Sequence, residues 1–310
     1  MSPGRAAVTP ALSAGVRRIT LNGANAPLSA LLAEPATATP RAVVVALHGC
    51  GLTSGYFDGQ AHPSLSLLTL GASRGYTVLA LDRPGYGRSS AHLPEGLPLT
   101  EQAAMVRAAL GAFAACHPTG AGFLLLAHSF GGKLALHLAA DGLPDLLGLD
   151  ISGCGHRSAV DPSRHPLRGG HMRTARHWGP LRLYPEGTFR PDRVPAAPVP
   201  SREVAELDGW PRRFGEVASR VRVPVRFTFA EHEQWWLHGD ADLADLAAGL
   251  SRAPRVRTER QPGSGHNISL GLTARTYHLR ALDFLAGCLN GPAPASPNAP
   301  VAPVEGQYLP

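Results

Sequence analysis

Residues 124–134 read LLLAHSFGGKL, in which an apolar run leads to a serine and then to two glycines. This order is typical of a buried strand, a tight turn and the start of a helix. A nucleophile elbow requires small residues two positions before and after its serine, because larger side chains would collide with neighbouring backbone. Ala127 and Gly131 occupy these positions around Ser129. We therefore predict that Ser129 is a nucleophile, the alternative being an ordinary turn between strand and helix.

Apolar runs alternate with helix-like stretches along most of the chain. Runs of strand length, the first two as an antiparallel pair, occupy 18–21, 28–33, 42–47, 77–81, 123–127, 146–151, 223–229 and 256–260. Apolar residues recur at helical spacing in 99–116, 133–140 and 274–288. Unbroken apolar runs are typical of parallel strands buried on both faces, and their alternation with helices implies right-handed crossovers. The prediction is an α/β fold with a mostly parallel, twisted sheet flanked by helices.

Composition divides the chain into a core and flanking segments. We expect the core to comprise residues 17–153 and 221–289, where strand and helix patterns alternate. Residues 154–220 are rich in Arg, Pro and His, interrupt that alternation, and are expected to form an insertion lying over the sheet. Residues 1–16 are predicted to be a flexible N-terminus, and the Pro/Ala-rich residues 290–310 a disordered tail.

The partners expected for the serine lie in the last third of the chain. Serine is a poor nucleophile unless an imidazole base, itself oriented by a carboxylate, removes its proton. With a nucleophile elbow the chain order is Ser, acid, His. His266 follows the last predicted strand in a glycine-rich turn, whereas His278 is expected on the surface of the final helix, so we predict His266 as the base. The loop after 223–229 supplies the acid, with Glu231 and Glu233 as candidates.

A glycine-rich loop follows the predicted strand 42–47 and reads HGCGLTS over residues 48–54. Beside a nucleophile elbow, such a loop supplies one backbone N–H of an oxyanion hole, and the residue after the serine supplies the other. The predicted donors are therefore Cys50 and Phe130. Each donor of this kind stabilises the transition state by about 3 kcal/mol. Without the elbow, the loop would be interpreted as the end of a strand.

Several other classes of function are excluded because the chain lacks the sequence motifs that they require. The loop at Gly49 is no dinucleotide fingerprint, because Ser54 stands where the third glycine belongs. Leu134 breaks the phosphate-loop pattern that Lys133 would otherwise complete. The histidines of 154–220 lack metal-ligand spacing, so neither a cofactor nor a metal is expected. No window approaches the ~18 apolar residues of a membrane helix. Four separated cysteines and the lack of a secretory pattern favour the cytoplasm.

Positive charge is concentrated in one part of the chain. The 310 residues carry 29 Lys+Arg and 23 Asp+Glu, a net charge of +6, and Lys133 is the only lysine. Residues 154–220 hold 12 arginines and 7 acids, or +5 of that excess. Because the remainder is nearly neutral, we expect no nucleic acid as partner. We expect a small-molecule acyl substrate, anionic or carrier-bound, such as a carboxylate or a phosphopantetheine thioester. The alternative is solvated arginine that reflects coding bias.

Together these residues resemble the α/β-hydrolase superfamily, specifically its cap-bearing members, over residues 17–289. Residues 81–89, LDRPGYGRS, are similar to the family's D-x-P-G-x-G-x-S segment, which implies a structural role. In the family, a proline opens the seventh strand and the acid follows that strand. Pro224 and the AEHE of residues 230–233 match this register, which implies Glu233. The resemblance also implies that 154–220 is a cap or lid, inserted after the sixth strand. A serine nucleophile in place of aspartate separates the chain from the epoxide-hydrolase and dehalogenase branches.

The resemblance implies a serine hydrolase that cleaves a carboxylic ester or thioester through an acyl-enzyme on Ser129, without a cofactor. An acyltransferase or cyclase would use the same three residues with a hydroxyl or amine in place of water. A cofactor-free haloperoxidase-like enzyme is a further alternative, and a non-catalytic binding protein is a more distant one. The intact set of Ser129, Glu233 and His266 argues against the last of these.

Overall fold

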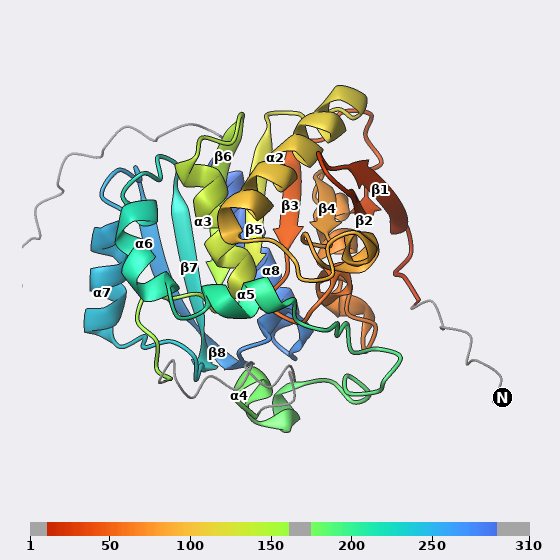
Figure 1. The fold of residues 1–310 in the computed structure, drawn as a ribbon. Helices are drawn as coiled ribbons and strands as arrows, with labels where there is room; N and C mark the ends of the chain where they lie inside the picture. The colour runs from red at the N-terminus through yellow and green to blue at the C-terminus, as the bar shows by residue number, and fades with distance from the viewer. Residues whose placement is uncertain (1–10, 161–174, 290–310) are drawn as a thin grey trace, which may run out of the picture.

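One sheet forms the centre of the molecule (Figure 1). The computed structural model describes residues 11–160 and 175–289. The strands in these ranges are β1 Arg17–Asn22, β2 Pro27–Ala33, β3 Val43–Leu47, β4 Thr77–Leu81, β5 Phe123–His128, β6 Leu146–Ser152, β7 Val225–His232 and β8 Val256–Gly265. They follow the order β1-β2-β4-β3-β5-β6-β7-β8. Strand β2 is antiparallel to both neighbours, and the pairings from β4 to β8 are parallel, as predicted.

The central strands consist of apolar residues because both of their faces are covered. Every residue of β3, β4 and β5 is buried. In the parallel register of these strands, Leu47 is opposite both Leu81 and Ala127. Their carboxyl ends therefore lie side by side, and the loop 48–54 and the turn at Ser129 emerge at the same edge of the sheet.

Helices cover both faces of this sheet. One hydrophobic core lies between the sheet and the helices α2 Leu99–Cys116, α3 Phe130–Ala140, α6 Trp210–Ala218 and α7 Asp240–Gly249. A second core, on the opposite face, includes α1 Leu67–Ser73 and α8 Ala274–Ala286. Figure 1 shows α2 and α3 in front of the strands and α8 behind them. The shorter helices are α4 Ala175–Trp178 and α5 Ser201–Glu206, with 3₁₀ turns at Ser54–Phe57, Pro63–Leu65, Gly87–Ala91, Leu181–Leu183 and Ile268–Leu270.

The segment between β6 and β7 contributes to two parts of the molecule. Its last helix, α6, belongs to the helix layer, where Trp210 and Val217 are buried in the core shared with α3 and α7. Helices α4 and α5 lie toward the carboxyl ends of the strands (Figure 1). Residues 161–174 of the expected cap lie outside the described residues, as do 1–10 and the expected tail 290–310.

Several elements differ from the sequence-based predictions, among them β7, which ends later than expected, α1, which was not predicted, and β8 and α7. Strand β8 continues to Gly265, so the expected glycine-rich turn before His266 lies within the strand. Pro262 is compatible with this because β8 is an edge strand, where a missing backbone N–H is tolerated. Helix α7 was not predicted, although Asp240 and Asp242 stand in its first turn, where acidic side chains stabilise a helix N-terminus.

Candidate active site

Ser129 stands between β5 and α3 in a strained backbone conformation. Its φ of 53° and ψ of −117° lie where residues other than glycine are rarely found. Its N–H donates a 2.7 Å hydrogen bond to the carbonyl of Ser152, at the end of β6, which fixes the turn against the neighbouring strand. The turn has the strand-to-helix geometry of a nucleophile elbow.

The backbone approaches this turn closely, which explains the small residues around Ser129. A Cβ on Gly131 would collide with the carbonyl oxygens of Leu47 and His48, so glycine is required there. Ala127 lies inside β5 and is fully buried, paired in register with Leu47. Its methyl group fits within the sheet, so alanine is accepted two positions before Ser129, where the elbow requires a small residue.

His266 and Glu233 form a buried pair. Nδ1 of His266 lies 2.7 Å from Oε2 of Glu233, and the residues are 2% and 7% exposed. The other carboxylate oxygen accepts hydrogen bonds from the backbone N–H groups of Gln234 (3.0 Å) and Trp235 (2.9 Å). Burial alone would raise the pKa of Glu233, but the His266 ring and these hydrogen bonds hold that pKa below its ordinary value. The carboxylate is thus placed to accept Nδ1–H, which leaves the lone pair on Nε2.

Glu231, the other candidate acid, has a different position. Its side chain is exposed and accepts a 2.7 Å hydrogen bond from the backbone N–H of Gly263, which joins the ends of β7 and β8. Of the two acids that sequence reasoning left open, the structure therefore brings Glu233 and not Glu231 to His266.

Ser129 and His266 line one pocket at the carboxyl edge of the sheet. His266 follows β8 directly and packs against Gly153, where a Cβ would come within 2.8 Å of the ring. Gly153 also has a φ of 58°, so two independent constraints require glycine beside this ring.

Other histidines near the pocket have packing roles. The ring of His128 is buried and stacked on Tyr56, with centroids 4.7 Å apart. His278 was expected on the surface, but it is fully buried, and its Nε2 lies 3.0 Å from Oγ of Ser269. Burial lowers the pKa of His278 to about 3, so it stays neutral inside the core.

The two predicted oxyanion donors lie on the pocket wall beside Ser129. Cys50 is in the loop after β3, Phe130 begins α3, and both residues line the pocket. Within the described residues, neither of their backbone N–H groups donates to another protein group. Two unoccupied N–H groups beside a serine meet the requirement of an oxyanion hole, and the N-terminal end of α3 adds its positive partial charge.

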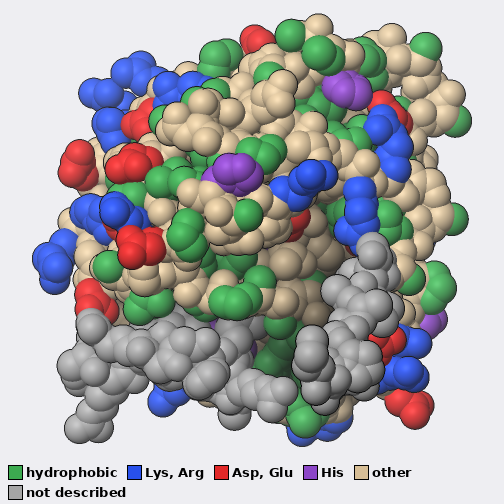
Figure 2. Space-filling view, turned by 45° about the vertical axis from the view of Figure 1, so that its right-hand side comes forward, with side chains coloured by type: hydrophobic (Ala, Val, Ile, Leu, Met, Phe, Trp, Pro, Cys, Tyr) green, Lys and Arg blue, Asp and Glu red, His purple; other side chains and the backbone are tan. Residues whose placement is uncertain are grey.

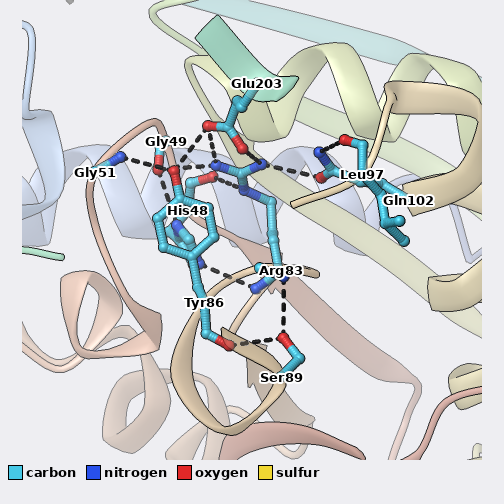
Figure 3. Close-up of polar contacts among 10 residues, drawn as sticks. His48, Gly49, Gly51, Arg83, Tyr86, Ser89, Leu97, Gln102 and Glu203 are labelled. Carbon is cyan, nitrogen blue, oxygen red and sulfur yellow. Dashed lines mark hydrogen bonds and ion pairs between the residues drawn. The ribbon is translucent and has the colours of Figure 1, made fainter. Parts of the chain in front are cut away.

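A buried arginine holds the loop that carries Cys50 (Figure 3). Arg83 donates from Nε to the carbonyl of His48 (2.7 Å) and from Nη2 to the carbonyl of Gly49 (3.1 Å). Its backbone N–H donates to Nε2 of His48 (3.1 Å). In a trans peptide the C=O and the following N–H point in opposite directions. Because the Gly49 carbonyl points to Arg83, the N–H of Cys50 is directed away from the arginine.

Glu203 of α5 completes this network (Figure 3). Its carboxylate forms two hydrogen bonds of 2.8 Å with Arg83 and accepts a third, of 2.9 Å, from the hydroxyl of Tyr86. That hydroxyl accepts a 3.0 Å bond from the N–H of Gly51, and Arg83 also donates to Gln102 (3.1 Å). Neither charged side chain is exposed. The ion pair therefore joins α5 to the loop that carries Cys50.

Sequence reasoning missed several polar residues of the pocket wall, among them His177 and Lys133. His177 of α4 lies with its ring centroid 6.4 Å from that of His266. Lys133 of α3 is 2% exposed and also lines the pocket. Helical spacing could have identified Lys133, because it stands four residues after Ser129 and so one turn along the helix. Ser158, Asp208 and Asn267 are further polar residues of the wall, and its apolar residues include Leu52, Leu207, Pro211, Trp235 and Trp236.

The arginines of the expected cap point mainly to the surface. On the face in Figure 2, basic and acidic side chains are interspersed rather than gathered in one basic patch. Among the described residues, the pocket wall contains no arginine. Surface ion pairs of this segment include Arg157–Asp242, Arg190–Asp192, Arg202–Glu95 and Arg220–Asp141.

The structure, as far as it is described, places no group of three or more His, Cys, Asp or Glu residues so that it could hold a metal ion. In the described ranges, no helix combines the length and the apolar character needed to cross a membrane.

Sheet order, elbow and histidine–carboxylate pair together define the class of protein as an α/β hydrolase. The model of the alpha/beta hydrolase family matches residues 44–279, and the chain belongs to this family. The predicted fold class and the resemblance are therefore confirmed.

Solved structures of very different enzymes share the fold. A highly thermostable carboxyl esterase from Bacillus coagulans has a TM-score of 0.65 and 16% identity, with 89% of this chain and 100% of that chain covered. The proline iminopeptidase of Mycobacterium smegmatis has a TM-score of 0.60 and 17% identity, covering 88% and 99%. An epoxide hydrolase, CorEH, has a TM-score of 0.62 and 16% identity, covering 88% and 99%. These identities show the fold alone. No curated protein matches the sequence.

We predict that Glu203→Gln destabilises the protein much more than Glu206→Gln, although both residues lie on α5. The first change leaves Arg83 buried without its carboxylate, which lowers the free energy of unfolding by about 3–5 kcal/mol. The second removes a partly exposed ion pair with Arg213, worth about 0–1 kcal/mol. Urea unfolding measures both values, and equal losses would contradict the importance of the buried network.

The lowered pKa of Glu233 predicts a pH dependence of stability. A carboxyl group whose pKa is lowered by folding stabilises the protein above its unfolded-state pKa, near 4.5, and this contribution is lost as the pH falls through the folded value. The difference in unfolding free energy between wild type and Glu233→Gln should therefore shrink on acidification below about pH 4.5. Denaturant unfolding across this range measures it, with Glu231→Gln as control. A difference independent of pH would contradict the prediction.

Proposed function

We propose that the protein is a serine hydrolase that cleaves a carboxylic ester or thioester through an acyl-enzyme on Ser129. The observation that supports this most is the buried Glu233–His266 pair, which shares a pocket with a serine on a strained elbow. The two unoccupied N–H groups of Cys50 and Phe130 add the electrostatic element that acyl transfer requires.

Each residue has a distinct role in this mechanism. Nε2 of His266 takes the proton of the Ser129 hydroxyl as its oxygen attacks the substrate carbonyl carbon. The N–H groups of Cys50 and Phe130 stabilise the oxyanion of the tetrahedral intermediate. Glu233 accepts Nδ1–H, holds the ring in the reactive tautomer and stabilises its protonated form.

The intermediate then breaks down in two stages. The bond between the carbonyl carbon and the leaving oxygen or sulfur breaks, and the leaving group takes the proton from His266. Water, deprotonated by the same ring, attacks the acyl-enzyme and releases the acid and Ser129. A hydroxyl or amine bound in place of this water would convert the reaction to acyl transfer or cyclisation.

Active-site labelling tests the proposed nucleophile. A fluorophosphonate should modify the wild type at Ser129, because the probe captures an activated serine through its phosphorus. Ser129→Ala and His266→Ala should both abolish labelling and reduce kcat by at least ~10⁴-fold. Mass spectrometry of the labelled peptide identifies the site, and 4-nitrophenyl esters and acyl thioesters of graded length report the rate.

Ser158→Ala is the matched control, because Ser158 also lines the pocket but is not on the elbow. It should keep both labelling and esterase activity. Full activity in Ser129→Ala, or labelling that persists in His266→Ala, would overturn the proposed mechanism.

A further inference from the structure

Lys133 is the only lysine in the chain and lies beside the proposed nucleophile. It stands on the first turn of α3, four residues after Ser129, and lines the same pocket while only 2% exposed. Side chains on a helix lean toward its N-terminus, which here is the pocket end. The ammonium is therefore directed toward the site and away from bulk solvent.

Aromatic rings surround this ammonium. Nζ lies 5.1 Å from the ring centroid of Phe130, 5.7 Å from that of Trp210 and 5.5 Å from that of Trp236. Such rings attract a cation through their faces, but they accept none of its three N–H bonds as an oxygen would. Within the described residues, no oxygen accepts a hydrogen bond from Lys133 and no carboxylate forms an ion pair with it.

Nearby thiols do not supply the missing negative charge. Cys50 and Cys154 are the cysteines that act electrostatically on Lys133. Burial raises the pKa of Cys154 to about 12 and that of Cys50 well above its ordinary value, so both remain neutral.

Nearby carboxylates are already engaged by arginine. Glu203 and Glu206 act on Lys133 electrostatically, but Glu203 is bound by Arg83 and Glu206 by Arg213. The two acids therefore balance the two arginines. The positive charge of Lys133 is the one that these carboxylates leave unbalanced. Burial lowers the pKa of Lys133, as expected of an ammonium that has lost water without gaining an anion.

We propose that Lys133 binds a carboxylate carried by the substrate, so that the protein acts on esters or thioesters of anionic molecules. The proposal deepens the hydrolase function and rests on it. One ammonium offsets one negative charge, so a carboxylate matches Lys133, whereas a dianionic phosphate would leave a charge buried and unpaired.

The structure also indicates where the preference for an anion would come from. Asp208 also lines the pocket, so its lining carries an acidic side chain as well as Lys133, and a carboxylate gains only where it reaches the ammonium. The described arginines of the expected cap do not line the pocket. We therefore assign anion recognition to Lys133 on α3 rather than to the described arginines of residues 154–220.

Paired esters test this assignment. Wild type should hydrolyse 4-nitrophenyl hydrogen glutarate with a higher kcat/KM than 4-nitrophenyl pentanoate, which has the same chain length without the carboxylate. Lys133→Met keeps the volume and fits an aromatic surrounding, but it removes the charge. It should lower kcat/KM for the glutarate ester by about 10- to 100-fold and leave the neutral ester within about threefold of wild type.

Further substrates and variants separate the sources of the effect. A pentanoate ester with a carboxylated nitrophenol shows whether the anion belongs to the leaving group instead of the acyl chain. Lys133→Arg retains the charge and should keep most of the preference. Arg182→Met removes one positive charge from an exposed position in the expected cap and should change neither ester. Thermal unfolding shows whether each variant is folded.

A binding measurement that requires no catalysis tests the carboxylate site separately from the hydrolase function. Glutarate should bind wild type in titration calorimetry, and Lys133→Met should abolish that binding. If the esters are hydrolysed with the same anionic-to-neutral ratio in wild type and Lys133→Met, the carboxylate site is wrong and the hydrolase function stands. If no ester is hydrolysed but glutarate binding depends on Lys133, the hydrolase function is wrong and the carboxylate site stands.

Discussion

The buried ion pair between Arg83 and Glu203 joins the three parts of the molecule that the site requires in fixed relation: the loop after β3, the loop after β4 and helix α5. Such a pair adds little net stability compared with well-packed apolar residues, since both charges lose their water. Its contribution here is to hold these three parts in position. An apolar replacement could fill the same space, but it would release the Gly49 carbonyl and with it the orientation of the Cys50 N–H. The structural role implied for residues 81–89 is thus to orient the N–H of Cys50, a proposed oxyanion donor.

A second constraint acts from the other side of the pocket, where the peptide of Ser129 is held in a conformation that costs about 1–3 kcal/mol. The surrounding sheet maintains it through the hydrogen bond to Ser152 and the contact of Gly131 with the end of β3. The N–H groups of Cys50 and Phe130 therefore come from two rigidly held turns rather than from mobile loops. An oxyanion hole preorganised in this way needs no rearrangement during the reaction.

Sequence patterns predicted the parts of this architecture that depend on local chemistry. Strands β3 to β6 were placed within one residue at each end, because runs of Val, Leu and Ala reflect burial on both faces. Turn chemistry and chain order also pointed to Ser129 and His266, and the structure places both residues in one pocket. The Arg83–Glu203 pair could not be predicted, because its members are 120 residues apart and Glu203 lies where no periodic pattern indicates a helix. The residues alone left Glu231 and Glu233 open, because the choice depends on how β7 ends, and only the family resemblance implied Glu233.

Phe130 links the oxyanion hole to the charges around it. Its N–H is a proposed oxyanion donor, while its ring lies between two cations, with Cζ of Arg83 at 4.9 Å and Nζ of Lys133 at 5.1 Å from the centroid. The arginine is neutralised by Glu203 and the lysine is not, so the field on the substrate side of this ring is set by Lys133. The N-terminal end of α3 would then stabilise two anions. Its backbone N–H groups and dipole would stabilise the oxyanion, and Lys133 would stabilise the substrate carboxylate. The net charge of +6 resides largely in residues 154–220, whereas Lys133, the buried cation that lines the pocket, lies outside that segment.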